Sequence, residues 1–172
     1  MEEIEIKHIS TLNILQLQEI CIKTFYQTFA KDNSEDNMKN YIDERFSLEK
    51  LNNELNNNNS EFYFAILNNN IIGYLKINYA DAQTEIKKST TLEIERIYVL
   101  SEYQGRKVGQ LLFDKAVQIA NIKKMEYIWL GVWERNLRAI NFYKKNGFIE
   151  FGEHIFKLGD EEQKDIMMKM NV

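Results

Sequence analysis

The sequence predicts an α/β fold in which a mixed sheet lies between helices. Strand-length runs of aromatic and β-branched residues recur along the chain, and they alternate with segments whose apolar residues return every three or four positions. The 172 residues contain no proline, no Gly/Ser linker and no internal repeat, so nothing marks a boundary between domains. We therefore expect residues 1–172 to form one domain.

The first third of the chain favours a strand followed by helices. A short strand is expected at residues 4–9, and an amphipathic helix follows it to Phe29 behind a serine or threonine cap. A second helical stretch covers residues 33–46. The polar segment after it ends in four asparagines, residues 56–59, which we interpret as a surface loop.

The rest of the chain predicts mainly strands, with two helices among them. Residues 62–67 and 71–79 predict a hairpin, because the asparagines between them tolerate positive φ in a tight turn. A strand over 92–99, a glycine-bearing loop and a helix from Val108 follow in that order. The last expected elements are a buried strand, a helix stopped by Gly147 and two final strands, at residues 127–132, 136–146, 148–155 and 164–170.

Composition excludes several classes of protein. Hydrophobic residues make up 44% and charged residues 28% of the chain, as in an ordinary globular domain rather than a disordered one. A net charge of -4 disfavours binding to nucleic acid, and no apolar run is long enough to insert in a membrane. The single cysteine, Cys21, cannot form an internal disulfide, which favours a cytoplasmic location and a core thiol. Neither histidine has a metal-ligand pattern, so no metal is expected.

The charge is unevenly distributed. Residues 1–88 carry a net charge of -5 and residues 89–172 a net charge of +1. The second half is therefore the better place for an anionic cofactor.

The segment from Gln104 to Gly109 lies between a predicted strand end and a predicted helix start. Such a loop presents unpaired backbone N–H groups and the positive end of a helix dipole, which together hold phosphate. The alternative is that Gly105 and Gly109 only make a turn. A second segment, Ile128–Phe148, carries Asn136, Ala139, Phe142 and Tyr143 before Gly147-Phe148.

These two ordered motifs resemble the GNAT superfamily of acyl-CoA-dependent N-acyltransferases. Residues 92–98, 128–134, 142–145 and 159–163 more narrowly resemble the PaiA group of bacterial polyamine N-acetyltransferases, and the similarity extends over nearly the whole chain. The resemblance implies the GNAT fold, with a mixed, mostly antiparallel sheet of six or seven strands, about four helices and splayed strands at the cofactor cleft. Lys107 stands where the superfamily's loop pattern has its first glycine, and we expect this to be tolerated.

The resemblance also implies acetyl-CoA as co-substrate and assigns residues to it. The backbone of the strand at Ile97, Tyr98 and Val99 would bond the pantetheine arm, with a β-bulge near Glu95-Arg96 splaying the strand. Asn136 would contact a pantetheine amide, beside Ala139. The expected pyrophosphate loop and helix start comprise Gln104, Gly105, Arg106, Lys107, Val108, Gly109 and Gln110. The cations expected to meet phosphates, or else to form a solvated surface, are Arg106, Lys107, Arg135, Arg138, Lys144 and Lys145.

Transfer of an acetyl group to an amine needs a base for the ammonium and an acid for the leaving thiolate. Tyr143 matches the superfamily's general acid and also borders the cofactor. Glu95 is the candidate base, through a water, and Glu93 lies on the same strand two residues earlier. The two glutamates could exchange roles, or both could belong to a solvated face.

The resemblance favours a small-molecule amine acceptor such as spermidine or spermine, bound by a monomer or a homodimer without nucleic acid or membrane. Carboxylates would attract such a polycation. The candidates are Asp32, Glu35, Asp36, Asp81, Asp160, Glu161 and Glu162. The alternatives are a protein or peptide amine as acceptor, and a regulator that binds acyl-CoA without catalysis.

Overall fold

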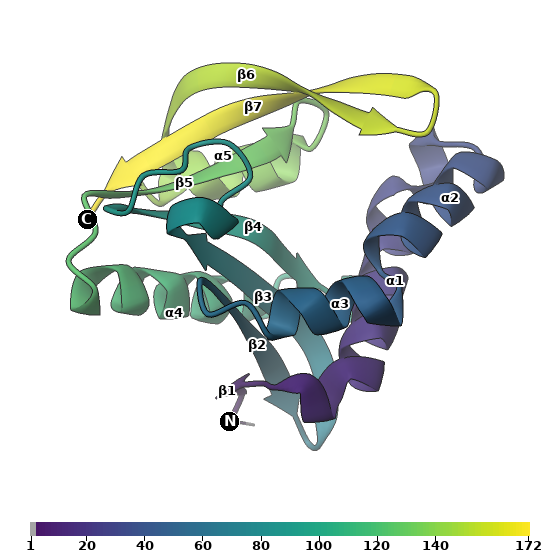
Figure 1. The fold of residues 1–172 in the computed structure, drawn as a ribbon, viewed down its shortest axis with the longest axis horizontal. Helices are drawn as coiled ribbons and strands as arrows, with labels where there is room; N and C mark the ends of the chain where they lie inside the picture. Colours follow the sequence, from purple (N-terminus) through teal and green to yellow (C-terminus); the bar gives the residue numbers. More distant parts are fainter. Residues whose placement is uncertain (1–2) are drawn as a thin grey trace.

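The computed structural model describes residues 3–172, which form a seven-stranded sheet with helices on both faces (Figure 1). The strand order is β1-β2-β3-β4-β5-β7-β6, and only the β4–β5 pair is parallel. The expected mixed, mostly antiparallel sheet is thereby confirmed. The strands are β1 (Glu5–His8), β2 (Ser60–Leu67), β3 (Asn70–Tyr79), β4 (Thr91–Val99), β5 (Tyr127–Trp133), β6 (Ile149–Leu158) and β7 (Glu161–Asn171).

Among the described residues there are five α-helices, where about four were expected. The additional helix is α3, in the polar segment that the sequence analysis left without structure. Ser47 caps it by accepting a hydrogen bond from the Lys50 N–H at 3.2 Å, and Leu51, on the inner face of the helix, is fully buried. The helices are α1 (Ile14–Phe29), α2 (Glu35–Arg45), α3 (Leu48–Leu55), α4 (Val108–Ile122) and α5 (Leu137–Lys145).

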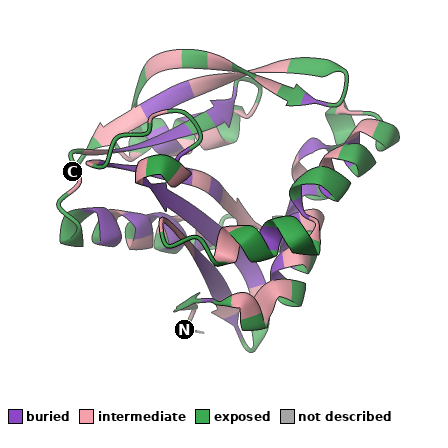
Figure 2. Ribbon diagram, viewed as in Figure 1, coloured by how far each residue is buried: buried purple, intermediate pink, exposed green. Residues whose placement is uncertain are grey.

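Two hydrophobic cores lie on opposite faces of the sheet, and most of the central strands are buried (Figure 2). One core packs α4 and α5 on the sheet through Leu112 and Ile140. The other packs α1, α2 and α3 through residues such as Phe25. Cys21 is fully buried in this second core, where burial raises the pKa of its thiol to about 11, as suits the expected core thiol.

The sheet is interrupted at its centre. β4 pairs with β5 only over Thr91–Glu93, so the edge of β4 beyond Glu93 has no strand beside it on that side. A bulge lies on the opposite edge: Ile94 pairs with Ile77 and Arg96 with Lys76, which leaves Glu95 unpaired between them. The expected bulge and splayed strands are therefore confirmed.

The β6–β7 hairpin forms one edge of the sheet, along the top of the view in Figure 1, and its tip extends to the start of α2. Gln163 Nε2 donates to Asn33 Oδ1 at 2.9 Å, and a Cβ at Gly159 would lie 2.0 Å from Asn37 Oδ1. Within residues 3–172, none of the helices is long and apolar enough to cross a membrane.

Candidate active site

A cleft of about 1460 Å³ opens where β4 and β5 diverge. Its walls come from β4, β5, β6 and β7, from α1, α2 and α5, and from the loops after β3 and before α4. Both hydrophobic cores reach it, so the cleft joins the two faces of the sheet. Of the predicted catalytic and cofactor residues, all line the cleft except Lys144 and Arg106. The Arg106 guanidinium lies 5.5 Å from the centre of the Tyr103 ring.

The loop before α4 presents free backbone donors. Gly105 has φ 82° and Lys107 φ 64°, so the lysine takes the left-handed geometry at the pattern's first glycine position at a cost of about 1–2 kcal/mol. Side chains cap α2, α3 and α5, but none caps α4. Within the described chain, the N–H groups of Val108, Gly109 and Gln110 make no hydrogen bond. This helix start is therefore suited to an anion.

Side chains fix this loop to its surroundings. Gln104 Nε2 donates to the Val99 carbonyl at 3.1 Å, and Arg138 on α5 donates to Gln104 Oε1. Gln110 Nε2 donates to Asn146 Oδ1 at 3.0 Å, which ties α4 to the end of α5. The loop is thus pre-organised between β4 and α5.

The six candidate phosphate-binding cations separate into two groups. Lys107, Arg135, Arg138 and Lys145 line the cleft. Lys144 instead lies 2.8 Å from Glu150, outside the lining residues. For Lys144 and Arg106, the alternative given in the sequence analysis, a solvated surface rather than a phosphate contact, is the better description.

Asn136 begins α5 as its N-cap, accepting from the Ala139 N–H at 3.2 Å. This use occupies its oxygen and leaves its amide N–H₂ group without a hydrogen bond among the described residues, and both Asn136 and Ala139 line the cleft. The sequence motif therefore has a structural role as well as the predicted role in binding.

Tyr143 lies on α5 with 7% of its surface exposed, and its ring packs against Phe142 and Phe148. Burial raises the pKa of the phenol above its usual range. Within residues 3–172 no hydrogen bond involves its hydroxyl, although the residue lines the cleft. The group is a protonated donor without a competing partner.

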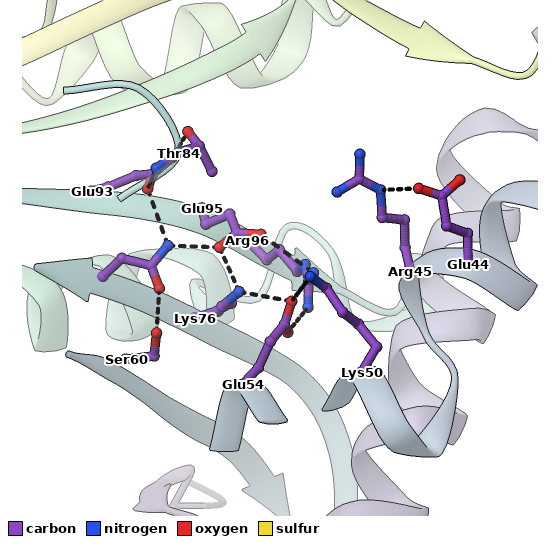
Figure 3. A network of polar contacts seen from close by, with 11 residues as sticks. Glu44, Arg45, Lys50, Glu54, Ser60, Lys76, Thr84, Glu93, Glu95 and Arg96 are labelled. Carbon is purple, nitrogen blue, oxygen red and sulfur yellow. Dashed lines mark hydrogen bonds and ion pairs between the residues drawn. The ribbon is translucent and has the colours of Figure 1, made fainter. Parts of the chain in front are cut away.

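Glu93 is buried and held by hydrogen bonds (Figure 3). It accepts from the Thr84 N–H at 2.8 Å, from the Thr84 hydroxyl at 2.5 Å and from Asn78 Nδ2 at 3.0 Å. Burial, reinforced by the charge of Glu95, raises the pKa of Glu93 even though these hydrogen bonds oppose the shift.

Glu95, at the bulge, belongs to an ion-pair network shown in Figure 3. Lys76 Nζ lies 2.5 Å and Arg96 3.3 Å from its oxygens, and both cations also contact Glu54 of α3, at 3.1 and 2.9 Å. Burial alone would raise the pKa of Glu95, but Arg96 and Lys76 outweigh it and lower the pKa to about 2. Sequence reasoning missed Glu54 because it missed α3.

The acidic residues predicted to line the acceptor side are only partly brought together. Asp32 and Asp81 line the cleft. The remaining candidates do not, because they lie on the outer face of α2 or at the tip of the β6–β7 hairpin: Glu35, Asp36, Asp160, Glu161 and Glu162. Glu85 and Asp165, which the sequence analysis did not select, line it instead.

Asp165 lies in a row across three strands, paired with Trp133 of β5 and His154 of β6. His154 Nε2 is 3.9 Å from Asp165, and His154 Nδ1 is 3.3 Å from Glu85. Burial raises the pKa of Asp165 to about 6, with His154 opposing the shift. A single carboxylate in a run of strand residues gives no sequence signal for this position.

The uncapped helix start, the unpaired edge of β4 and the adjacent cations fit the pyrophosphate and pantetheine parts of acetyl-CoA. Within residues 3–172 no group of three or more His, Cys, Asp or Glu side chains could hold a metal ion. A splayed sheet with this loop at its opening is the arrangement expected of an acyltransferase that takes its acyl group from an acyl-CoA.

The chain belongs to the acetyltransferase (GNAT) family, whose profile matches residues 22–148. It is 37% identical to an uncharacterized N-acetyltransferase of Lactobacillus delbrueckii subsp. lactis over 98% of each chain. It is 28% identical to a spermidine N(1)-acetyltransferase of Thermoplasma acidophilum over 96% of each. The structure resembles that of the PaiA N-acetyltransferase from Thermoplasma acidophilum in complex with coenzyme A, with a TM-score of 0.81, 26% identity and 99% of both chains covered. The protein is thus an acetyl-CoA-dependent N-acetyltransferase.

We expect Asp165→Asn to raise the melting temperature at neutral pH by several degrees. The folded pKa of about 6 exceeds the ordinary 3.8, so the folded state binds the proton more tightly than the unfolded state. The destabilisation of the fold by ionised Asp165 therefore reaches its full size above pH 6 and disappears as the pH falls towards 4. Thermal unfolding followed by circular dichroism across that range measures the gain.

Asp43→Asn is the matched control, because Asp43 is an exposed carboxylate paired with Lys39 outside the cleft. It should give no pH-dependent gain. A gain from Asp165→Asn that is equal at every pH would contradict the assignment of the shift to this carboxyl.

Proposed function

We propose that the acceptor is a polyamine such as spermidine or spermine, acetylated on a primary amine by direct attack in a ternary complex. The observation that carries this proposal is the set of carboxylates in the cleft: Asp32, Asp81, Glu85, Glu93, Glu95 and Asp165. Within the described residues, only Glu95 among them is paired with a lysine or arginine. The other five carboxylates can pair with the ammonium groups of a polycation; Arg45, Lys87 and Lys157 also line the cleft, besides the cations on the cofactor side.

Aromatic side chains support the same acceptor. Phe25 and Tyr41 stack at 4.4 Å, and Phe29 lies 5.7 Å from Trp133, with all four lining the cleft. Rings of this kind accommodate methylene segments and attract ammonium groups to their faces. The similarity to a relative named as a spermidine N(1)-acetyltransferase agrees with this acceptor.

A cytoplasmic location is part of the proposal. Its support is the sequence's single cysteine, which gives the fold no disulfide to maintain.

The cofactor is proposed to lie along the unpaired edge of β4, with the backbone of Ile97 and Val99 bonding its pantetheine arm. The N–H groups at the start of α4 hold the pyrophosphate, and Lys107, Arg135 and Arg138 meet nearby phosphate charge. When bound, acetyl-CoA supplies the thioester carbonyl that the amine attacks. The protein's positioning of the two reactants contributes up to roughly 7–11 kcal/mol in ideal systems.

Proton transfer is proposed to involve three side chains. Tyr143 donates its phenolic proton to the leaving sulfur. Glu93 accepts the proton of the acceptor ammonium through a water, because its pKa is raised whereas that of Glu95 is about 2. Glu95 remains ionised and attracts the ammonium electrostatically. The difference in pKa supports this division of the two roles that the sequence left open.

Release of the CoA thiol with a panel of amines tests the acceptor. We expect kcat/KM for spermidine and spermine to exceed that for lysine-containing peptides and N-terminal peptide amines by at least about tenfold. Peptides of the same net positive charge are the matched comparison. Turnover with peptides alone would identify a protein N-acetyltransferase, and acetyl-CoA binding without turnover on any amine would identify a regulator; either result would overturn the proposal.

Tyr143→Phe should lower kcat by about 10²-fold or more, because only the proton donor is lost. The Kd of acetyl-CoA, measured by isothermal titration calorimetry, should change less than about twofold. Tyr127→Phe on β5, outside the cleft lining, is the control with unchanged kcat. A Tyr143→Phe enzyme with the wild-type rate would remove the general-acid assignment.

Glu93→Gln and Glu95→Gln should differ in their effects on turnover and on the free energy of unfolding. Glu93→Gln is expected to lower kcat by about 10²-fold or more. Because both carboxylate oxygens accept hydrogen bonds from buried or part-buried donors, it should also destabilise the fold, by about 1–3 kcal/mol. Glu95→Gln leaves Lys76 and Arg96 short of a counter-charge and should destabilise the fold by about 3–5 kcal/mol. Steady-state kinetics and urea unfolding of both variants provide the comparison; the reverse pattern of rates would make Glu95 the base.

A further inference from the structure

The carboxylate of Asp165 is nearly enclosed, with 14% of its side chain exposed, yet it has no close donor. Within residues 3–172 no N–H or O–H group hydrogen-bonds to it, and its nearest cationic candidate is His154 Nε2 at 3.9 Å. Its oxygens are not among the side-chain atoms sealed from solvent without a partner. Since Asp165 lines the cleft, the open side of the carboxylate faces the space that the acceptor enters.

Such a carboxylate lacks the hydrogen bonds and counter-charges that would compensate for its burial. Removing it from water raises its pKa to about 6, because no hydrogen bond or fixed cation compensates the lost hydration. Glu95 is the contrasting case, since Lys76 and Arg96 complete it within the fold. A cationic ligand would supply at Asp165 the positive charge that Lys76 and Arg96 supply at Glu95.

The surroundings of Asp165 select for a particular cation. Trp133 is its cross-strand neighbour, and Phe29 and Phe156, whose ring centres lie 6.3 Å apart, also line the cleft. A Cβ at Gly131 would lie 3.4 Å from Asp165 Oδ2, so the glycine keeps the floor beside the carboxylate open. A single charge among rings fits an alkylammonium better than a strongly hydrated inorganic ion.

Asp165 is separate from the carboxylates placed at the reaction. Glu93 pairs with Trp129 at one position of β5, and Asp165 pairs with Trp133 four residues further along the same strand. Four residues of strand separate the backbones of these two positions by about 13 Å, and the Asp165 carboxylate reaches back from its position to lie beside Gly131. A molecule that contacts both the β4 carboxylates and Asp165 therefore needs two charged groups joined by a chain of several atoms.

We propose that Asp165 binds a second ammonium group of the acceptor, the one that is not acetylated, and so selects di- and polyamines over monoamines. This inference rests on the proposed function, because it assigns a specificity-determining residue to the amine acceptor. The part of the acceptor between the two charges passes over the open floor at Gly131, and Phe29, Trp133 and Phe156 line the cleft around the Asp165 end.

The test compares α,ω-diaminoalkanes of about four to ten carbons with n-alkylamines of the same length, using CoA thiol release. In the wild-type enzyme we expect the longer diamines to exceed the matched monoamines in kcat/KM by about ten- to a hundredfold. Asp165→Asn should remove that preference by raising KM for the diamine, with kcat and the monoamine rates nearly unchanged. Asp43→Asn removes an exposed carboxylate outside the cleft and should keep the preference.

The outcomes distinguish the two proposals. A wild-type preference for diamines that persists in Asp165→Asn would overturn the role of Asp165 and leave the amine acceptor standing. Equal rates for diamines and monoamines in the wild type would also overturn it. Absence of turnover with every small amine would overturn both proposals together. Calorimetric binding of acetyl-CoA to Asp165→Asn establishes that the variant is folded, and Asp165→Glu should restore part of the diamine preference.

Discussion

The separation of β4 from β5 after Glu93 is the constraint on which the site depends. A sheet that continued its pairing here would seal both cores from one another and leave no exposed backbone at Ile97 and Val99. The bulge at Glu95 works on the opposite edge of the same strand, where one unpaired residue bends β4 while Arg96 resumes the pairing with β3. The divergence of β4 from β5 thus opens a cleft that residues of both cores line.

The irregular strand is held by buried charge rather than by hydrophobic contact alone. Lys76 and Arg96 are 4% and 8% exposed, and each contacts both Glu54 and Glu95. Removing one member of such a network leaves a buried charge unpaired, which costs far more than the pairing contributes. The helix α3 therefore matters to the site although it does not line the cleft, since it carries Glu54 to the back of the bulge.

Local patterns in the sequence were sufficient for most of the fold and for the loop before α4, whereas the assignment of cofactor residues came from the resemblance to the GNAT superfamily. The strands, the turn at Asn68-Asn69 with its positive φ, and the loop before α4 all depend on residues close together in the chain. Sequence reasoning missed α3, although Ser47 and the spacing of Leu48, Leu51 and Leu55 carried a weak signal. It also missed Asp165, whose place in the cleft follows from the pairing of β7 between β5 and β6, a contact that no local pattern reports.

The tip of the β6–β7 hairpin meets the start of α2 through the Gln163–Asn33 hydrogen bond and the close approach of Gly159 to Asn37. This contact joins the far end of the hairpin to α2, and β6, β7 and α2 all contribute residues to the cleft wall. The loop before α4 makes no part of the contact. A change in the length of the hairpin tip would therefore alter this junction and leave the loop before α4 as it is.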